Sequence, residues 1–177
     1  MFVRRKHIRA LVEELLARNK VHAAPVPVER IAASLSLVVR KEPADDDLSG
    51  FLVRDRKKKT AVIGVNANHH PNRRNFTVAH ELGHFLLHDG DAIHVDRQFQ
   101  VKLRDKESSK GTDLEEKEAN LFAAELLMPR RFLEEELAAI DVMDLEQEEV
   151  LKELADRYGV STQALAFRLS YLGYVNL

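Results

Sequence analysis

Residues 78–88 read VAHELGHFLLH, and this stretch constrains the fold most because its spacing requires an intact helix. His80 and His84 are four residues apart, so on a helix both imidazoles project from one face and can bind one metal ion. Glu81 follows the first histidine, in the position of a general base beside such an ion. Five apolar residues give the same helix a second face to bury: Phe76, Ala79, Leu82, Leu86 and Leu87. The motif therefore predicts a metal-carrying amphipathic helix packed against a sheet.

His88 lies on the same helical stripe but is not expected to be the third ligand. Eight residues separate it from His80, a rise of about 12 Å along a helix, whereas zinc ligands approach one ion to within about 2.1 Å. We expect His88 to interact with the last carbonyls of the helix instead. The longer motif with a third histidine also fails, because Leu87 and Gly90 stand where it needs glycine and histidine. The third ligand must come from another element.

A second long helix is predicted to begin near Thr112 or Asp113 and to end at Met128, because Pro129 cannot continue it. An acidic ligand from this helix would complete the two-histidine, one-glutamate set of catalytic zinc sites, which leaves the fourth position open. The helix carries four glutamates: Glu115, Glu116, Glu118 and Glu125.

Helical spacing narrows this choice. Glu116 lies on one stripe with Asn120 and with small residues that permit close approach to the motif helix. Glu118 is turned about 200° from Glu116, towards the opposite side. A structural alternative is that Glu115 or Glu116 closes a capping box at the start of the helix. Spacing alone leaves both interpretations open.

The two segments together, TVAHELGHFLLH and EEKEANLFAAELLMP, resemble the ImmA/IrrE family of metallopeptidases, a gluzincin-like group of regulatory zinc proteases. The resemblance covers roughly residues 25–135. It implies that His80, His84 and Glu116 bind Zn²⁺, with Glu118 as the alternative acidic ligand. It also implies that Glu81 is the catalytic glutamate.

The same resemblance implies a regulatory zinc endopeptidase whose protein substrate is a helix-turn-helix transcriptional repressor. An intact set of His80, Glu81 and His84 argues against a purely structural metal site, because such a site has no use for a general base. The alternative is a non-proteolytic anti-repressor, or a DNA-associated binding module that acts through the C-terminal helices.

Composition limits the ligands and the partners. The chain has no cysteine, so any metal must be held by histidine, aspartate or glutamate. With neither an export signal nor disulfides, we expect a cytoplasmic protein. No segment approaches the roughly 20 apolar residues of a membrane-spanning helix, so no membrane partner is expected. The net charge of -2 gives no general attraction to nucleic acid, and direct DNA binding is not expected.

The remaining patterns predict an α+β fold. We expect a small antiparallel sheet of about three strands packed on the motif helix, with additional helices and a C-terminal helical pair. Strands are predicted at residues 37–40, 51–53 and 61–65, and a further strand near 99–103. One of the strands between Phe51 and Val65 is a candidate to pair with an extended substrate. Asn72 is expected to cap the motif helix.

Two domains are expected, with residues 1–140 as the metallopeptidase domain and residues 141–177 as a helix-turn-helix-like extension packed on it. In the extension, Gly159 separates two helices and Ser161 caps the second. The helix that would read DNA offers only Arg168 as a basic residue and follows an acidic run. Phosphate binding needs a basic face, so we expect a packed helix pair.

The loop from Asp91 to Gly111 contains His94, Arg97 and Arg104 and is a candidate wall of a substrate groove. A plain connection between two helices is the alternative. A donor that stabilises the oxyanion is also expected, but no residue in the sequence identifies itself as that donor.

Overall fold

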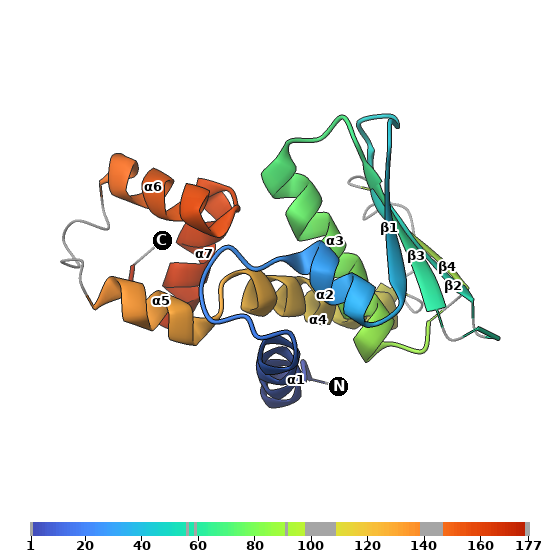
Figure 1. Ribbon diagram of the computed structural model, residues 1–177, viewed down its shortest axis with the longest axis horizontal. Coiled ribbons are helices and arrows are strands. Elements are labelled where there is room, and N and C mark those ends of the chain that lie inside the picture. Colours follow the sequence, from blue (N-terminus) through green and yellow to red (C-terminus); the bar gives the residue numbers. More distant parts are fainter. Residues whose placement is uncertain are drawn as a thin grey trace.

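The computed structural model describes residues 2–55, 57–58, 60–90, 92–97, 109–138 and 147–175. Within these residues the chain forms seven helices and one four-stranded sheet. The bounds are α1 Arg5–Arg18, α2 Val28–Ser34, β1 Leu37–Glu42, β2 Leu48–Asp55, β3 Thr60–Asn66, α3 Pro71–Leu87, β4 Ile93–Arg97, α4 Ser109–Leu127, α5 Arg130–Leu137, α6 Glu148–Tyr158 and α7 Thr162–Leu172. The sheet lies at one end of the molecule with α3 beside it, and α5, α6 and α7 lie at the other end (Figure 1).

The sheet has the strand order β1-β3-β2-β4 and is mixed. Strand β3 lies between β1 and β2 and runs parallel to β1 and antiparallel to β2. The α+β class and the packing of a sheet on the motif helix are confirmed. The prediction of about three antiparallel strands is wrong in two respects, because one pairing is parallel and a fourth strand, β4, is present.

The sequence did not predict β4, because a half-buried strand usually turns its apolar side chains to the core, and β4 turns a histidine to the core instead. His94 pairs with the buried Leu52 and shares its side of the sheet, whereas Ile93 and Val95 lie on the exposed side. The strand predicted near residues 99–103 lies outside the described residues. The expectation that β2 or β3 pairs with a substrate is wrong, because both have neighbours on either side, and the edge strands within the described residues are β1 and β4.

Helix α3 covers one face of the sheet (Figure 1). Its contact with β2 depends on Gly50, where a Cβ atom would lie 2.5 Å from the Thr77 Cγ2 atom and 3.6 Å from the Glu81 Oε1 atom. The expected cap at Asn72 is wrong. His70 is the N-cap residue and Pro71 begins the helix, while the Asn72 side chain donates to Val160 O at 2.8 Å.

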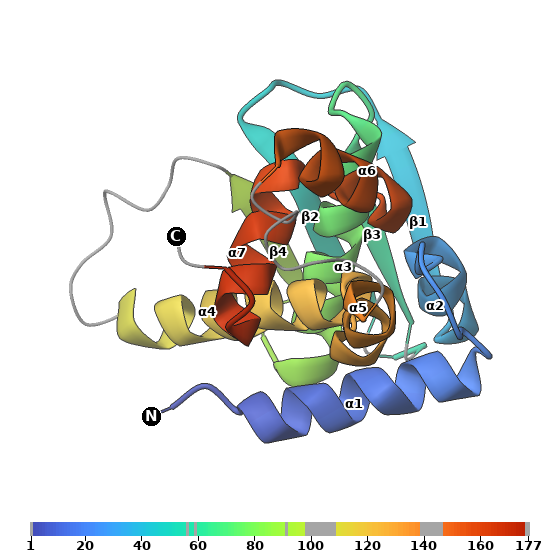
Figure 2. The ribbon, with the colours of Figure 1, turned by 90° about the vertical axis from the view of Figure 1, so that its left-hand side faces the viewer.

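Helix α4 packs along α3, and α1 packs against α4 and lies alongside it (Figure 2). Because α4 begins at Ser109, Glu116 lies two turns inside it and cannot close a capping box at its start. That alternative is therefore wrong.

The C-terminal pair α6 and α7 follows the predicted pattern. Gly159 ends α6 with a left-handed φ of 64°, and the Ser161 hydroxyl accepts from Ala164 N at 3.1 Å. Arg168 of α7 is buried and donates to Glu125 at 2.6 Å and to Met128 O at 3.1 Å. Its guanidinium is thus used inside the protein. The division at residue 140 stays a prediction. Across the described ranges, every helix is too short or too polar to cross a membrane.

Candidate metal centre

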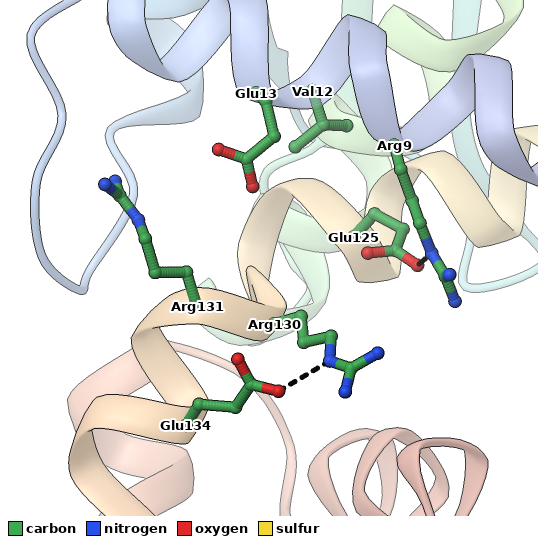
Figure 3. A pocket seen from close by; sticks show the side chains of 7 residues that line it. All are labelled: Arg9, Val12, Glu13, Glu125, Arg130, Arg131 and Glu134. Atoms are coloured by element: carbon green, nitrogen blue, oxygen red, sulfur yellow. Dashed lines mark hydrogen bonds and ion pairs between the residues drawn. The ribbon is translucent and has the colours of Figure 1, made fainter.

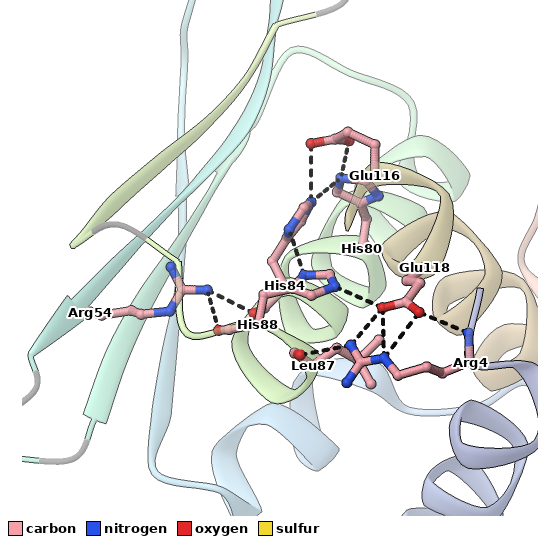
Figure 4. A network of polar contacts seen from close by, with 8 residues as sticks. All are labelled: Arg4, Arg54, His80, His84, Leu87, His88, Glu116 and Glu118. Carbon is pink, nitrogen blue, oxygen red and sulfur yellow. Dashed lines mark hydrogen bonds and ion pairs between the residues drawn. The ribbon is translucent and has the colours of Figure 1, made fainter. Parts of the chain in front are cut away.

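Four side chains from three elements converge at the face of α3 that meets α4 (Figure 4 shows three of them). His80 and His84 come from α3, Glu116 from α4 and His94 from β4, and one nitrogen or oxygen of each lies within 4.8 Å of the others. The His80 and His84 Nε2 atoms are 3.1 Å apart. The Glu116 carboxylate lies 3.3 Å from each of them.

A residue of α4, Asn120, fixes which nitrogen of His80 carries the proton. His80 Nδ1 lies 3.0 Å from the Asn120 Oδ1 atom, and an amide oxygen only accepts hydrogen bonds, so Nδ1 carries the proton. A His80 ring with its one proton on Nδ1 presents a lone pair at Nε2, towards Glu116 and His84. Asn120 lies four residues beyond Glu116, so one stripe of α4 supplies both groups.

Electrostatics keep this cluster in a form that can bind a cation. Burial lowers the pKa of His84, which favours the neutral imidazole. Burial alone would raise the pKa of Glu116, but the close contacts of its carboxylate with the His80 and His84 imidazoles outweigh burial and lower that pKa. Neutral histidine and ionised glutamate are the states that ligate metal.

Glu81 lies beside the cluster and is fully buried at 0% exposure. Among the described residues, neither of its carboxylate oxygens has a hydrogen-bond partner. Burial, reinforced by the nearby charges of Asp96 and Glu116, raises the pKa of Glu81 well above its ordinary value. A buried carboxyl with free oxygens beside metal-binding groups is suited to exchange a proton with a molecule bound there.

His94 also belongs to the cluster. From the sequence it was expected only as part of a loop that could line a substrate groove. Its Nε2 atom lies 3.6 Å from Glu116 Oε1, and its ring centroid lies 3.9 Å from that of His84. Burial, together with the neighbouring His84, lowers the pKa of His94 to about 4, so the ring is neutral at neutral pH. Arg97 ends the same strand, and Arg104 lies outside the described residues.

The residues present fit a bound divalent cation. Two imidazole nitrogens and one carboxylate meet at a common point, which is the donor set of catalytic zinc sites. Within the described ranges, the His94 Nε2 atom also lacks a hydrogen-bond partner although it is buried. Buried polar atoms without partners are rare in folded proteins, and a metal or a bound substrate would give these atoms one.

The interpretation of His88 as a residue that binds the last helix carbonyls is wrong. Its Nδ1 atom lies 3.3 Å from His84 Nδ1, and its Nε2 atom lies 3.2 Å from Glu118 Oε2 (Figure 4). Arginines bind the carbonyls instead: Arg54 donates to His84 O at 2.7 Å, and Arg4 donates to Leu87 O at 2.9 Å. A guanidinium carries several donors, so these long side chains satisfy the end of the helix from other elements.

Glu118 points away from the cluster, as its helical position predicts. It is 2% exposed and accepts from Arg4 Nε at 3.0 Å and from the Arg4 backbone N at 2.8 Å. The hydrogen bond from Arg4 lowers the pKa of Glu118 to about 2. Glu118 is therefore an ionised partner of Arg4 and His88.

A separate cavity of about 310 Å³ opens between α1, α4 and α5 (Figure 3). It is lined by Arg9, Val12, Glu13, Glu125, Arg130, Arg131 and Glu134. Two of its arginines are already paired, Arg9 with Glu125 at 3.0 Å and Arg130 with Glu134 at 2.6 Å. The cavity shares no residue with the metal cluster and has no excess of either charge.

Comparisons with known proteins agree with this geometry. The chain is 29% identical over 125 residues to the metallopeptidase ImmA of Bacillus subtilis (strain 168), which covers 71% of this chain and 64% of ImmA. It is 30% identical over 122 residues to the uncharacterized immunity region protein 2 of Bacillus phage phi105, which covers 69% of this chain and 68% of that protein.

A solved structure described as a Mycobacterium tuberculosis transcriptional regulator is similar with a TM-score of 0.58 and 15% sequence identity. The similar region covers 93% of this chain and 46% of that one, and at this identity the likeness concerns the fold alone. The family model of the IrrE N-terminal-like domain matches residues 32–170, which include the whole cluster. The resemblance read from the two motifs is thus confirmed, and the chain belongs to this IrrE N-terminal-like family of metallopeptidases.

Proposed function

We propose that this protein is a zinc-dependent endopeptidase that cleaves a helix-turn-helix transcriptional repressor. His80, His84 and Glu116 hold the metal, and Glu81 is the catalytic residue. The observation that carries the proposal is the buried Glu81 carboxyl, which lacks a hydrogen-bond partner among the described residues, follows His80 in the chain and is close enough to Glu116 to feel its charge. A metal site that only stabilised the fold would have no use for this carboxyl.

The chemistry then follows from the positions of the side chains. Zinc, when bound, lowers the pKa of a water molecule and polarises the scissile carbonyl. Glu81 accepts a proton from the attacking water and delivers it to the nitrogen of the leaving amine. Its raised pKa favours the uptake of a proton, because burial makes the Glu81 carboxylate a stronger base than an exposed one.

His94 supplies the donor that the sequence did not identify. Three ligands leave the fourth position of a catalytic zinc site open, so His94 is assigned to the substrate. Its neutral ring can donate one hydrogen bond to the carbonyl oxygen on which charge develops. His94 lies on β4, the edge strand of the sheet as far as the described residues go, where an extended peptide can pair with the backbone.

The substrate class rests on the relatives. One relative is named as a metallopeptidase and another as a phage immunity region protein. A repressor that maintains immunity is a substrate of the expected kind. The second candidate function is an anti-repressor that binds the same repressor without cutting it. Contact with DNA through α7 is disfavoured because Arg168 is buried against Glu125.

The deciding experiment incubates the zinc-loaded protein with a helix-turn-helix repressor, chosen from the neighbouring reading frames if one of them encodes such a protein. We expect cleavage at one or a few sites, detected by mass spectrometry, and loss of cleavage with a chelator. The Glu81→Gln variant should bind zinc but leave the repressor intact. Normal cleavage by this variant would overturn the mechanism. Release of the repressor from DNA without cleavage by the wild type would favour the anti-repressor.

The metal ligands have a matched control on the same helix. Glu116→Ala should weaken zinc binding, because it removes the only acidic ligand from the described cluster. Glu115→Ala removes a carboxylate one position away, outside the cluster, and should leave zinc affinity unchanged. Equal zinc affinity of the two variants would show that Glu116 is not a ligand.

A further inference from the structure

We propose that His88, Glu118 and Arg4 are positioning residues for the metal ligand His84, and that they connect the N-cap of α1 to the metal centre. The inference rests on the metal site of the proposed function. It adds a chain of hydrogen bonds that runs from His84 through His88 and Glu118 to Arg4 (Figure 4).

The chain begins at Glu118, which is ionised and can only accept hydrogen bonds. His88 Nε2, 3.2 Å away, must therefore donate, and a His88 ring that carries this one proton has an acceptor at Nδ1. His84 Nδ1 lies 3.3 Å from this acceptor and must carry a proton. His84 Nε2 is then the lone-pair atom, and it faces His80 and Glu116.

Each member of this chain is held firmly. The His88 side chain is 5% exposed and that of Glu118 is 2% exposed. Arg4 binds Glu118 through its backbone N, its Nε atom and its Nη2 atom, and the Nη2 atom also reaches Leu87 O. Partners of metal-bound histidines commonly fix the ring orientation and raise ligand basicity. Here a second histidine, His88, lies between the metal ligand His84 and the carboxylate of Glu118.

The outermost member lies outside the family-matched region. Arg4 precedes residues 32–170, whereas His88 and Glu118 lie within them. Helix α1 is also joined to α4 by a second ion pair, Arg9 with Glu125 at 3.0 Å, which has no contact with the metal cluster. Both ion pairs hold α1 to α4, but only the pair of Arg4 and Glu118 leads to the metal cluster. Comparing their loss therefore distinguishes support of the metal site from attachment of α1.

The test measures the dissociation constant for Zn²⁺ by competition with a chromogenic chelator. We expect His88→Phe, which keeps a ring but has no acceptor, to weaken zinc binding by about ten- to a hundredfold. Arg4→Gln should weaken it severalfold, and Arg9→Gln should leave it unchanged. The visible spectrum of the Co²⁺-loaded protein should shift in His88→Phe and Arg4→Gln but not in Arg9→Gln, because only the first two disturb a ligand.

Thermal unfolding of the metal-free variants checks that each one folds, and Arg4→Gln remains informative if His88→Phe does not. Wild-type zinc affinity and an unchanged Co²⁺ spectrum in a folded His88→Phe or Arg4→Gln variant would overturn the network. Equal loss of affinity in Arg4→Gln and Arg9→Gln would also overturn it, since docking of α1 would then be the cause. A wild-type protein that binds no zinc would overturn the proposed function itself.

Discussion

Gly83 of α3 faces Ala119 of α4 so closely that a Cβ atom at position 83 would lie 3.1 Å from the Ala119 Cα atom. This contact lies between the two motif histidines along α3 and between Glu116 and Asn120 along α4. The missing side chain thus sets the spacing of the two helices at the height of the metal cluster. A glycine inside a helix lowers its stability by roughly 0.5–1 kcal/mol, and here it permits the approach of Glu116.

Gly83→Val should push α3 and α4 apart. We expect the free energy of unfolding to fall by about 1–3 kcal/mol from overpacking, and zinc affinity to fall with it. Chemical denaturation and chelator competition measure the two effects. Gly90→Ala is the matched control, because its nearest neighbour would be an Arg54 side-chain atom at 3.6 Å, an ordinary contact. Unchanged zinc affinity in Gly83→Val would show that the helix spacing does not limit the site.

Asn120→Ala should weaken zinc binding by about ten- to a hundredfold, because His80 Nδ1 loses the acceptor that fixes its tautomer. Asn120→Asp keeps an acceptor at the same position and should retain most of the affinity. Isothermal titration of the metal-free protein with Zn²⁺ distinguishes the two variants. If both lose affinity equally, the hydrogen bond to His80 is not the cause.

Glu81→Gln should stabilise the metal-free protein at neutral pH. The pKa of Glu81 is raised in the folded state above the ordinary 4.5, so folding at higher pH requires uptake of a proton. The two proteins should be equally stable below pH 4.5, and the wild type should lose stability relative to the variant as pH rises towards the folded pKa. Each pKa unit corresponds to about 1.4 kcal/mol. Parallel stability curves across this range, measured by urea denaturation, would contradict the assignment.

His94→Phe should lower kcat for repressor cleavage by about a hundredfold or more while zinc affinity stays at the wild-type level. The reason is that the phenyl ring keeps the volume of the imidazole but has no donor for the carbonyl oxygen. Single-turnover cleavage and zinc titration of the same preparation separate the two roles. A large loss of zinc affinity would make His94 a fourth metal ligand and the resting site a closed one.

Arg168→Met should lower the free energy of unfolding by about 3 kcal/mol, because it leaves the buried Glu125 carboxylate with Arg9 as its remaining partner. Arg157→Gln removes an ion pair with Glu136 in which the arginine side chain is 56% exposed, and it should cost at most about 1 kcal/mol. Equal effects in chemical denaturation would indicate that Arg168 does not hold α7 to α4.

Helical periodicity predicted those parts of the fold and the site that depend on residues close together in the sequence. The spacing of His80 and His84 located α3, and the stripe of Glu116 and Asn120 turned out to be the face of α4 that meets α3. Gly159 and Ser161 fixed the break between the last helices for the same reason. Such patterns repeat every three or four residues and need no knowledge of distant partners.

The features that the sequence did not reveal depend on contacts between distant residues. His88 was assigned to helix carbonyls because its partner Glu118 is 30 residues away in the sequence. Strand β4 was missed because His94 faces inward, where a strand usually carries apolar residues. A side chain that serves the site rather than the core therefore weakens the pattern by which its strand would be recognised.

The cluster takes its four members from α3, β4 and α4, and the span from His80 to Glu116 is 36 residues along the chain. An unfolded chain cannot bring these groups together, so a metal ion held by His80, His84 and Glu116 binds only native molecules. The number of zinc ions bound per chain would then count the correctly folded fraction of a preparation. Free zinc would raise the midpoint of thermal denaturation in proportion to the logarithm of its concentration.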